Sequence, residues 1–339
     1  MTATTGQTGD TRPLVVVLGA AGFVGSAVLR ELARHDLRVR AVSRRPVTVP
    51  AGARAEVETR SVDLTVPGAM AGAIEGADVV VHSIAYIAGS STWRITDGDT
   101  GAERVNVGLV RDLVEAVRAS GRPDTAVLFT GSVSAAGPSE RGVYDGTEPD
   151  EPQGEYDRQK LAAERVLLAA SAEGVLRGIS LRLPTVFGYG PDSTARDKGI
   201  VSSMVRRAVA GEPITMWHDG TVRRDLLYVE DVARAFAAAL GHLDALAGRH
   251  WVLGSGHGAE LGPVFTTVAR MVAERTGKPP VAVRSVEPPA HAEARDFASV
   301  TVDPRAFHEV TGWRAEVPLD EALDRTTAFS ASGAEEHFG

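Results

Sequence analysis

A tyrosine and a lysine four residues apart are the first residues whose types and spacing could do chemistry. Tyr156 and Lys160 open the segment "YDRQKLAAERVLLAAS", which predicts a helix, and positions i and i+4 share one helical face. A free phenol has a pKa of about 10 and rarely ionises at neutral pH. A neighbouring ammonium lowers that pKa, so that the phenol can exchange a proton with a carbonyl oxygen.

A serine is expected to join this pair. Ser132 ends the apolar segment 125–132, which predicts a buried strand, and ligands bind at the carboxyl ends of parallel strands. Its hydroxyl would hydrogen-bond the same carbonyl oxygen, while Lys160 would also hold the ribose of a bound nucleotide. By itself the Tyr156/Lys160 spacing also fits an ordinary pair of surface side chains. Whether this pair is catalytic therefore depends on the elements that surround it.

A glycine-punctuated turn follows the first apolar segment. In "LVVVLGAAGFVGSAVLRELARHD" the glycines are Gly19, Gly22 and Gly25, spaced G-x-x-G-x-x-G between a predicted strand and a predicted helix. Gly19 would permit the tight turn, Gly22 the close approach of a pyrophosphate and Gly25 the packing of helix against strand. An ordinary strand-to-helix turn is the alternative, but the position after the first strand favours dinucleotide binding.

The end of the second predicted strand indicates which dinucleotide binds. It reads Ser43-Arg44-Arg45, without the carboxylate that would hold the ribose 2′-hydroxyl of NAD. Guanidinium groups pair with phosphate, so the two arginines predict the 2′-phosphate of NADPH. Two solvated surface arginines are the alternative.

Alternating apolar segments and amphipathic helices predict the fold class. Unbroken apolar runs indicate strands buried on both faces, and alternating β and α units indicate an α/β, doubly wound parallel sheet of the Rossmann type with a smaller mixed C-terminal lobe. The crevice between the two is the expected ligand site. The candidate strands are 14–19, 38–43, 58–64, 77–85, 125–132 and 178–184. The predicted domains are a disordered tail 1–12, a nucleotide-binding domain 13–188 to which 224–255 returns, a substrate lobe 189–223 and 256–328, and a flexible tail 329–339.

The composition excludes several other classes of function. The 339 residues contain no cysteine, which rules out disulfides and thiolate chemistry and fits a reducing cytoplasm. The net charge of −8 disfavours a nucleic-acid partner, and no apolar run reaches the roughly 18 residues that a membrane span needs. The nine histidines show no metal-ligand spacing, so no metal is expected.

Taken together, these motifs resemble those of extended short-chain dehydrogenases/reductases. The likeness covers roughly residues 14–325 and includes the segments "LRLPTVFGYGP" (181–191) and "RRDLLYVEDVARA" (223–235). It implies catalysis by Ser132, Tyr156 and Lys160, and a homodimer formed through two helices, one of them containing Tyr156. The residues that it implies for cofactor binding are Gly19, Gly22, Phe23, Val24, Gly25, Ser43, Arg44, Arg45, Asp63, Leu64, Ser83, Ile84, Ala85, Asn106, Thr130, Tyr156, Lys160, Pro184 and Val186.

Within this family the sequence disfavours two reactions. Related dehydratases carry an Asp-Glu pair directly after the catalytic hydroxyl residue, whereas Val133 and Ser134 stand here. Epimerases of the UDP-galactose type place an asparagine near Thr185 and hold NAD tightly, which the arginine pair disfavours. An exchanging NADPH and a reductase are therefore expected.

The substrate is expected to be a nucleotide-sugar. Several segments look close to those of dTDP-4-keto-6-deoxyhexose 4-ketoreductases, which make deoxysugars for antibiotics. In that likeness Arg224 meets the pyrophosphate, Trp217 stacks on the base, and Trp93 and Arg94 border the sugar. The full set of expected substrate residues is Trp93, Arg94, Ser134, Thr185, Lys198, Trp217 and Arg224. The ordinary alternatives are that Arg224 pairs with Asp225 or Asp231, and that the tryptophans are packing residues.

Three other functions compete with this hypothesis. The first is an NAD-dependent nucleotide-sugar epimerase, and the second is a reductase of a non-sugar ketone, which would have less reason for the Arg224 segment. The third is a non-catalytic NADP-binding sensor, which the intact Tyr156/Lys160 pair disfavours.

Overall fold

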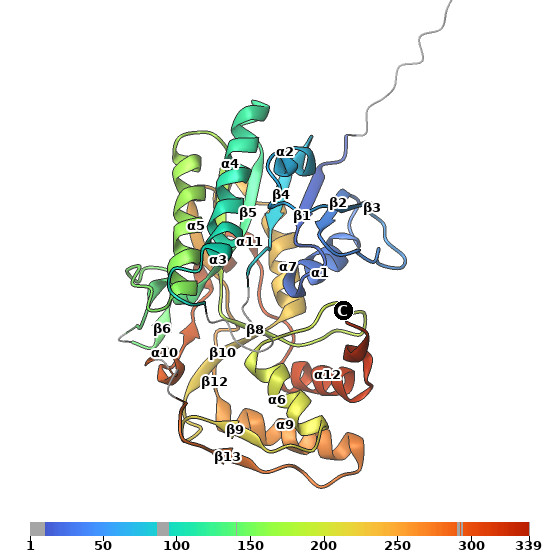
Figure 1. Cartoon of the computed structure of the whole chain (residues 1–339), viewed down its shortest axis with the longest axis vertical. Helices are drawn as coiled ribbons and strands as arrows, with labels where there is room; N and C mark the ends of the chain where they lie inside the picture. The colour runs from blue at the N-terminus through green and yellow to red at the C-terminus, as the bar shows by residue number, and fades with distance from the viewer. Residues whose placement is uncertain (1–10, 87–94, 140, 290–291, 293, 339) are drawn as a thin grey trace, which may run out of the picture.

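Seven parallel strands form the central sheet of the computed structural model, which describes residues 11–86, 95–139, 141–289, 292 and 294–338 (Figure 1). The first strand lies inside the sheet, between β4 and β2, with later strands added on both sides, as in a doubly wound fold. The sheet order is β11 (Arg249–Val252), β7 (Arg177–Leu183), β5 (Ala126–Ser132), β4 (Val79–His82), β1 (Leu14–Leu18), β2 (Arg38–Ser43) and β3 (Glu56–Ser61).

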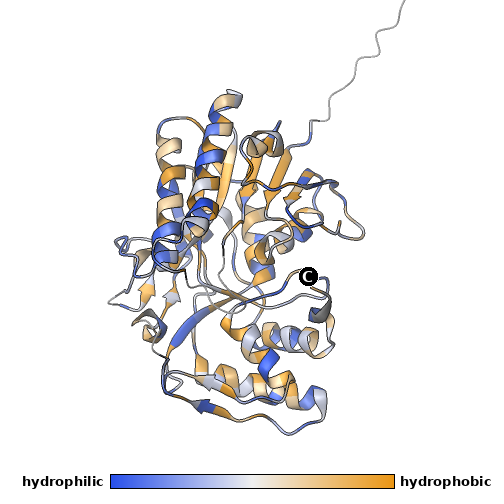
Figure 2. Cartoon of the chain, viewed as in Figure 1, coloured by the Kyte–Doolittle hydropathy of each residue, from blue (hydrophilic) through white to orange (hydrophobic). Residues whose placement is uncertain are grey.

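Helices cover both faces of this sheet, which explains why its central strands are continuous apolar runs. All five residues of β1 are buried, and Figure 2 shows the sheet strands mainly in the hydrophobic colour. Each fully buried valine or leucine contributes about 1.5–3 kcal/mol. One face is covered by α1 (Phe23–Leu32), α7 (Val229–Leu240), α8 (Leu243–Leu246) and α11 (Arg305–Thr311). The other face is covered by α2 (Ala69–Ile74), α4 (Leu109–Ser120) and α5 (Glu155–Ala172).

The six predicted strands are present, and two of them have clearly different bounds, because the segment expected at 77–85 is a strand only at Val79–His82. The segment expected at 58–64 forms β3 at Glu56–Ser61. The chain leaves the strand early because Asp63 accepts hydrogen bonds from the backbone N–H and the hydroxyl of Thr65, which closes a turn. The alanine-rich helix α7 packs against α1 through small buried residues such as Ala233 and Ala235, as its composition predicts.

A smaller lobe lies below the large sheet in Figure 1 and is built mainly from the second half of the chain. Its core is packed between helices and short strands, with Phe187, Tyr228 and Phe265 almost fully buried. Its helices are α6 (Ile200–Val209), α9 (Leu261–Thr276) and α12 (Leu319–Ala331). Its small sheets are β12 (Gly258–Glu260) with β10 (Arg223–Tyr228) and β8 (Thr185–Phe187), and β13 (Val283–Ser285) with β9 (Ile214–Met216).

Several further elements are short. A strand pair lies beside α10 near the lower end of the sheet domain in Figure 1. These elements are α3 (Thr100–Glu103), η1 (Arg104–Gly108), η2 (Val133–Ala136), β6 (Val143–Tyr144), α10 (Ala294–Phe297) and β14 (Thr301–Val302).

The end of the chain differs from the flexible tail predicted for 329–339. The Phe329 ring stacks on Tyr189, with ring centroids 4.7 Å apart. A 3-10 turn, η3 (Ala334–His337), carries Glu335, whose buried carboxylate accepts hydrogen bonds from Tyr189 at 2.8 Å and Arg206 at 3.1 Å. Aromatic stacking and a buried ion pair therefore dock residues 329–338 on the lobe. The tail predicted at 1–12 lies largely outside the described residues.

Two features of the described residues bear on the classes of function. No helix among the described residues is long and apolar enough to cross a bilayer. Within the same residues, no three histidine, aspartate or glutamate side chains gather as a metal site would require.

Candidate active site

The glycine turn lies where β1 ends and α1 begins, next to the point at which the strand order reverses. Gly19 has a φ of +87°, which is favourable only for glycine. A Cβ on Gly25 would lie 2.2 Å from the Gly19 carbonyl oxygen and 2.6 Å from Ser83 Oγ, so α1 can start this close only without a side chain there. Gly22 caps α1 without a side-chain hydrogen bond. The free N–H groups of the first turn, which contains Phe23 and Val24, suit a pyrophosphate.

The residues after β4 lie against this turn. The Ser83 hydroxyl donates to the Leu18 carbonyl oxygen at 2.8 Å, and the Ile84 side chain lies near Gly19. Ala85 follows them along the chain. The 83–85 segment therefore lies beside the glycine turn.

The side-chain amide of Asn106 makes hydrogen bonds that fix the same segment. Its Oδ1 accepts the backbone N–H of Tyr86 at 2.7 Å, and its Nδ2 donates to Gln159 on α5 at 2.8 Å. The asparagine lies in the π-helical turn η1, a feature that is frequent at functional sites. The side chain expected to bind cofactor therefore links the 83–86 segment to the helix that carries Tyr156.

The basic pair at the end of β2 lies beside the glycine turn. Arg44 and Arg45 are exposed, and Arg45 Nη2 donates to the Ala21 carbonyl oxygen at 2.8 Å. The pKa of Asp63 is lowered, first by hydrogen bonds from Thr65 and also by the charge of Arg44. Leu64 is buried and Ser43 is half-buried at the strand end. The residues predicted around the adenosine end are thus brought together.

Ser132 and the first turn of α5 are joined by hydrogen bonds. Ser132 Oγ lies 2.7 Å from Ser134 Oγ, and Ser134 Oγ donates to Asp157 Oδ1 at 2.6 Å. Asp157 Oδ2 accepts the N–H of Gly154, which caps the helix. Tyr156 precedes Asp157 and is half-buried. The expected serine and tyrosine are therefore positioned by neighbouring elements, and Ser134 bridges Ser132 and Asp157.

Lys160 lies one turn further along α5 and is buried against β5. Its Nζ lies 4.2 Å from the centroid of the Phe129 ring, and the residue is 3% exposed. Burial lowers the pKa of Lys160 to about 7, which the charge of Glu164 only partly offsets. The ammonium therefore titrates near neutral pH, where proton transfer is most efficient.

A fully buried histidine also lies next to Phe129. The rings of His82 and Phe129 have centroids 5.6 Å apart, and neither ring nitrogen of His82 has a hydrogen-bond partner in the described part of the chain. Burial and the nearby Lys160 lower the pKa of His82 to about 3. The Thr130 hydroxyl donates to the His82 carbonyl oxygen and joins β5 to β4 at this edge.

A buried ion-pair network supports the helix behind Lys160. Arg182 is 1% exposed and bonds Glu164 through Nε and Nη2, the latter at 2.6 Å, and it reaches Asp150 at 2.7 Å. Ser180 also donates to Glu164. Burial alone would lower the pKa of Arg182, but the hydrogen bonds and charge of Glu164, with those of Asp150, raise it. The network fixes β7 against α5, and β7 leads directly to Pro184.

Sequence reasoning missed Asp157, Glu164, Arg182 and His82. Arginine and histidine inside apolar strand segments were the available signal, because charged or polar residues are rarely fully buried without a role. Glu164 is also four residues after Lys160 on the same helix.

The lobe brings β8 to the sheet domain's edge. Thr185 and Val186 in β8 pair with Leu226 and Leu227 of β10, and Pro184, Thr185 and Val186 are half-buried. This places the residues expected at the nicotinamide at the junction of the domain and the lobe.

Arg224 is held by backbone carbonyl groups. Its Nη2 donates to the Asp296 carbonyl oxygen at 2.9 Å, and its Nη1 donates to that of Ala298. Asp225 accepts the N–H groups of Ser255 and Val302, and Asp231 accepts those of Glu316 and Val317. The two carboxylates that could have paired with Arg224 thus hold backbone of other segments.

The remaining substrate candidates are only partly placed. Trp217 and Lys198 are half-buried, at the end of β9 and before α6. Burial, and then the charge of Arg224, lower the pKa of His218, which indicates that the end of β9 lies near Arg224. Trp93 and Arg94 lie outside the described residues.

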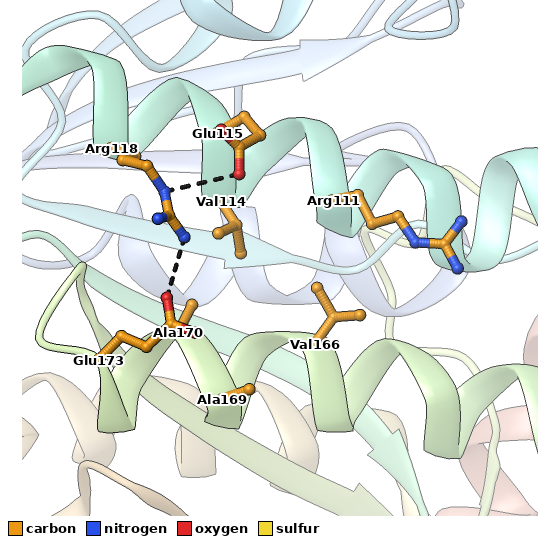
Figure 3. A pocket seen from close by; sticks show the side chains of 8 residues that line it. All are labelled: Arg111, Val114, Glu115, Arg118, Val166, Ala169, Ala170 and Glu173. Carbon is orange, nitrogen blue, oxygen red and sulfur yellow. Dashed lines mark hydrogen bonds and ion pairs between the residues drawn. The ribbon is translucent and has the colours of Figure 1, made fainter.

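A cavity of about 410 Å³ opens on the outside of the sheet domain, between α4 and α5. Figure 3 shows valine and alanine side chains in its centre and charged side chains around them. Its lining residues are Arg111, Val114, Glu115, Arg118, Val166, Ala169, Ala170 and Glu173. It contains none of the candidate active-site residues.

Known proteins resemble this chain in both sequence and structure. The chain is 30% identical over 249 residues to a 2'-dehydrokanamycin reductase of Streptomyces kanamyceticus, covering 70% of this chain and 62% of that protein. It is 28% identical over 327 residues to a UDP-glucose 4-epimerase of Mycolicibacterium smegmatis, covering 93% and 97%. The structure of MoeE5 in complex with UDP-glucose and NAD matches with a TM-score of 0.76 and 30% identity, covering 94% of this chain and 99% of that one.

The extent of these matches differs. The chain spans 60–62% of the length of several curated relatives, all of them reductases or dehydrogenases by name. The sequence profile described as the NAD dependent epimerase/dehydratase family matches residues 15–254, from β1 to just beyond β11. With the glycine turn, the Tyr156/Lys160 helix and the doubly wound sheet in place, the chain belongs to the NAD dependent epimerase/dehydratase family.

Proposed function

We propose that this protein is an NADPH-dependent reductase of the C4 ketone of a dTDP-4-keto-6-deoxyhexose, acting in the cytoplasm in the biosynthesis of antibiotic deoxysugars. One observation carries the proposal. Ser132 is joined to the helix turn that bears Tyr156, and Lys160 is buried one turn further on with a pKa of about 7. This arrangement provides a hydrogen bond and a proton at one place.

Each side chain would have a separate role in the reaction. NADPH, when bound, supplies the hydride. Tyr156 would give its phenolic proton to the C4 oxygen as negative charge develops there, and Ser132 would hydrogen-bond the hydroxyl that forms at the same oxygen. Lys160 would favour the phenolate that remains and hold the nicotinamide ribose. Its low pKa matches a group that helps to return the proton.

The choice of NADPH is supported by the end of β2. Arg44 and Arg45 are exposed beside the glycine turn, and no carboxylate occupies this position. A 2′-phosphate would receive paired guanidinium hydrogen bonds there, whereas the ribose diol of NADH would lack its usual acceptor.

The choice of a nucleotide-sugar is supported by the lobe and the relatives. Arg224 lies at the junction of lobe and sheet domain, and it would exchange its carbonyl partners for a pyrophosphate. The UDP-glucose bound to MoeE5 and the name of the Mycolicibacterium relative indicate this substrate class. The absence of an acid pair at 133–134 argues against dehydration.

A nucleotide-sugar epimerase is the second candidate and is equally compatible with the relatives. The Mycolicibacterium epimerase matches along 93% of this chain, and MoeE5 holds NAD. Such an enzyme would use the same Tyr156 and Lys160, retain NAD during turnover and consume no cofactor.

The homodimer is also part of the proposal. The outer faces of α4 and α5 carry Val166 and Ala169 between charged side chains, a pattern that suits burial against a second copy (Figure 3).

A panel of dTDP-4-ketosugars, supplied with NADPH or NADH and followed by NMR of the product, tests the reaction. A C4 alcohol formed with stoichiometric NADPH oxidation is expected. Interconversion of UDP-glucose and UDP-galactose without cofactor consumption would instead establish the epimerase.

Two variants test the residue roles in the same assay. Tyr156→Phe should lower turnover by about 10²–10⁴-fold while NADPH still binds, because only the proton donor is removed. Turnover at the wild-type rate would contradict the assignment.

Replacing both Arg44 and Arg45 by alanine should weaken NADPH binding by about tenfold or more and leave NADH binding nearly unchanged. Arg34→Ala, at an exposed arginine just after α1, is the matched control. An unchanged NADPH/NADH preference in the double variant would overturn the cofactor argument.

A further inference from the structure

Three side chains form a continuous hydrogen-bonded row behind the expected position of the reacting oxygen. Ser132 Oγ lies 2.7 Å from Ser134 Oγ, and Ser134 Oγ lies 2.6 Å from Asp157 Oδ1. Asp157 is 1% exposed, so the far end of the row is closed to solvent. Ser132 is the member at the strand end, where substrate would arrive.

The chemistry of Asp157 sets the direction of these hydrogen bonds. A carboxylate can only accept, and its two oxygens accept the Gly154 N–H and the Ser134 hydroxyl. Ser134 has one hydroxyl proton, and that proton points at Asp157. The contact between the two serines therefore requires Ser132 to donate to Ser134.

Ser132 is left with a lone pair for the substrate. Its own proton points at Ser134, and its oxygen also accepts the Ser134 backbone N–H at 3.3 Å. A sugar hydroxyl, which has a proton to give, matches this arrangement directly. A ketone oxygen, which can only accept, would require Ser132 to turn its proton away from Ser134.

We propose that Asp157 is a positioning residue that, through Ser134, orients Ser132 as a hydrogen-bond acceptor and so favours the alcohol over the ketone in the active site. The inference rests on the proposed function, because it assumes that the C4 oxygen lies at Ser132. For a reductase, it shifts the equilibrium on the enzyme toward the reduced product. Tyr156 then remains the proton donor to the ketone.

Two substitutions release the Ser132 proton by different routes. Ser134→Ala removes the acceptor and leaves the Asp157–Gly154 cap of α5 in place. Asp157→Asn keeps the cap through its carbonyl oxygen, while its amide donates to Ser134 and lets Ser134 donate to Ser132. Both variants should bind ketone better relative to alcohol, and the double variant should gain no more than either alone.

The measurement uses two complexes that cannot react: dTDP-4-keto-6-deoxyglucose with NADP⁺, and the alcohol that the wild-type enzyme forms from it with NADPH. The ratio of the two dissociation constants should shift toward the ketone by about five- to tenfold in each variant, which is the value of one hydrogen bond. NADPH affinity and thermal stability should change little. Glu173→Gln, at the far end of α5, is the control.

A wild-type ratio in both single variants, or additive shifts in the double variant, would overturn the inference. Failure of the wild-type enzyme to reduce this ketone would contradict the proposed function for this sugar but not the inference. Neutron diffraction of the ligand-free protein then decides the inference without a substrate. Deuterium on the line from Ser132 to Ser134, and from Ser134 to Asp157, supports it, and any other placement refutes it.

Discussion

Lys160 and Arg182 are two buried cations of the sheet domain whose pKa values are shifted in opposite directions. Lys160 is 3% exposed and Arg182 is 1% exposed. The lysine faces the Phe129 ring, and burial lowers its pKa to about 7. The arginine is bonded by Glu164 and Asp150, which together raise its pKa.

The difference shows what a buried charge needs in order to stay fixed. Removing a charged group from water costs several kcal/mol unless a partner compensates. Glu164 is one helical turn from Lys160, yet its hydrogen bonds go to Arg182 and Ser180 across the sheet. The arginine therefore keeps its charge and ties β7 to α5, while the lysine can gain or lose a proton near neutral pH, as acid–base chemistry requires.

Breaking the paired cation should have the largest effect. Glu164→Ala leaves Arg182 charged and uncompensated in the interior, and the free energy of unfolding should fall by about 3–5 kcal/mol. Urea unfolding followed by circular dichroism measures this. Replacing the pair together, with Glu164→Leu and Arg182→Met, should cost much less. A loss below about 1 kcal/mol in the single variant would mean that the network contributes little.

Removing the charge of Lys160 should change the free energy of unfolding in the opposite direction. Lys160→Met abolishes most turnover but should raise the free energy of unfolding by about 2–4 kcal/mol at pH 6, because no buried charge remains. In the wild type, the unfolded chain binds the lysine proton up to a pKa of about 10.5, whereas the folded protein releases it near 7. Wild-type stability therefore rises relative to the variant between pH 7 and 10.5.

Unfolding measurements across this range check the prediction. The stability gap between Lys160→Met and the wild type should be widest below pH 7 and close by about pH 10.5. A gap that does not depend on pH would show that the ammonium is not destabilised by burial.

The smallest effect concerns His82, a second group whose pKa is lowered by burial, as that of Lys160 is. Its folded pKa of about 3 lies below the value of 6.5 for an unfolded histidine, so the wild type loses stability as the pH falls through this window. His82→Leu removes that dependence and should be the more stable protein by about 2 kcal/mol at pH 5. Near pH 7.5 the two should be similar. Equal acid sensitivity of the two proteins would show that His82 does not titrate in this way.

The predictable part of the fold and site consists of local features. The six candidate strands, the glycine turn and the Tyr156/Lys160 helix were read from apolar runs, turn residues and a spacing of one helical turn. The φ of Gly19 and the close approach at Gly25 agree with the turn that the motif requires. Such features depend on neighbours within a few residues.

The unpredicted part consists of contacts between distant segments. The hydrogen bond from Ser134 to Asp157 and those from Arg224 to the carbonyl groups of residues 296 and 298 join segments far apart in the sequence. The tail was expected to be flexible, but Glu335 bonds Tyr189, 146 residues away. No local pattern distinguishes these partners from their competitors.

The amino-acid sequence by itself determined the parallel sheet, the glycine turn and the presence of a serine, a tyrosine and a lysine at one sheet edge, because apolar period and backbone geometry act over short distances. Only the tertiary structure decided that Lys160 lies against the Phe129 ring while Arg182 takes the hydrogen bonds of Glu164. Charge states in an interior depend on which partner packing brings within hydrogen-bond distance.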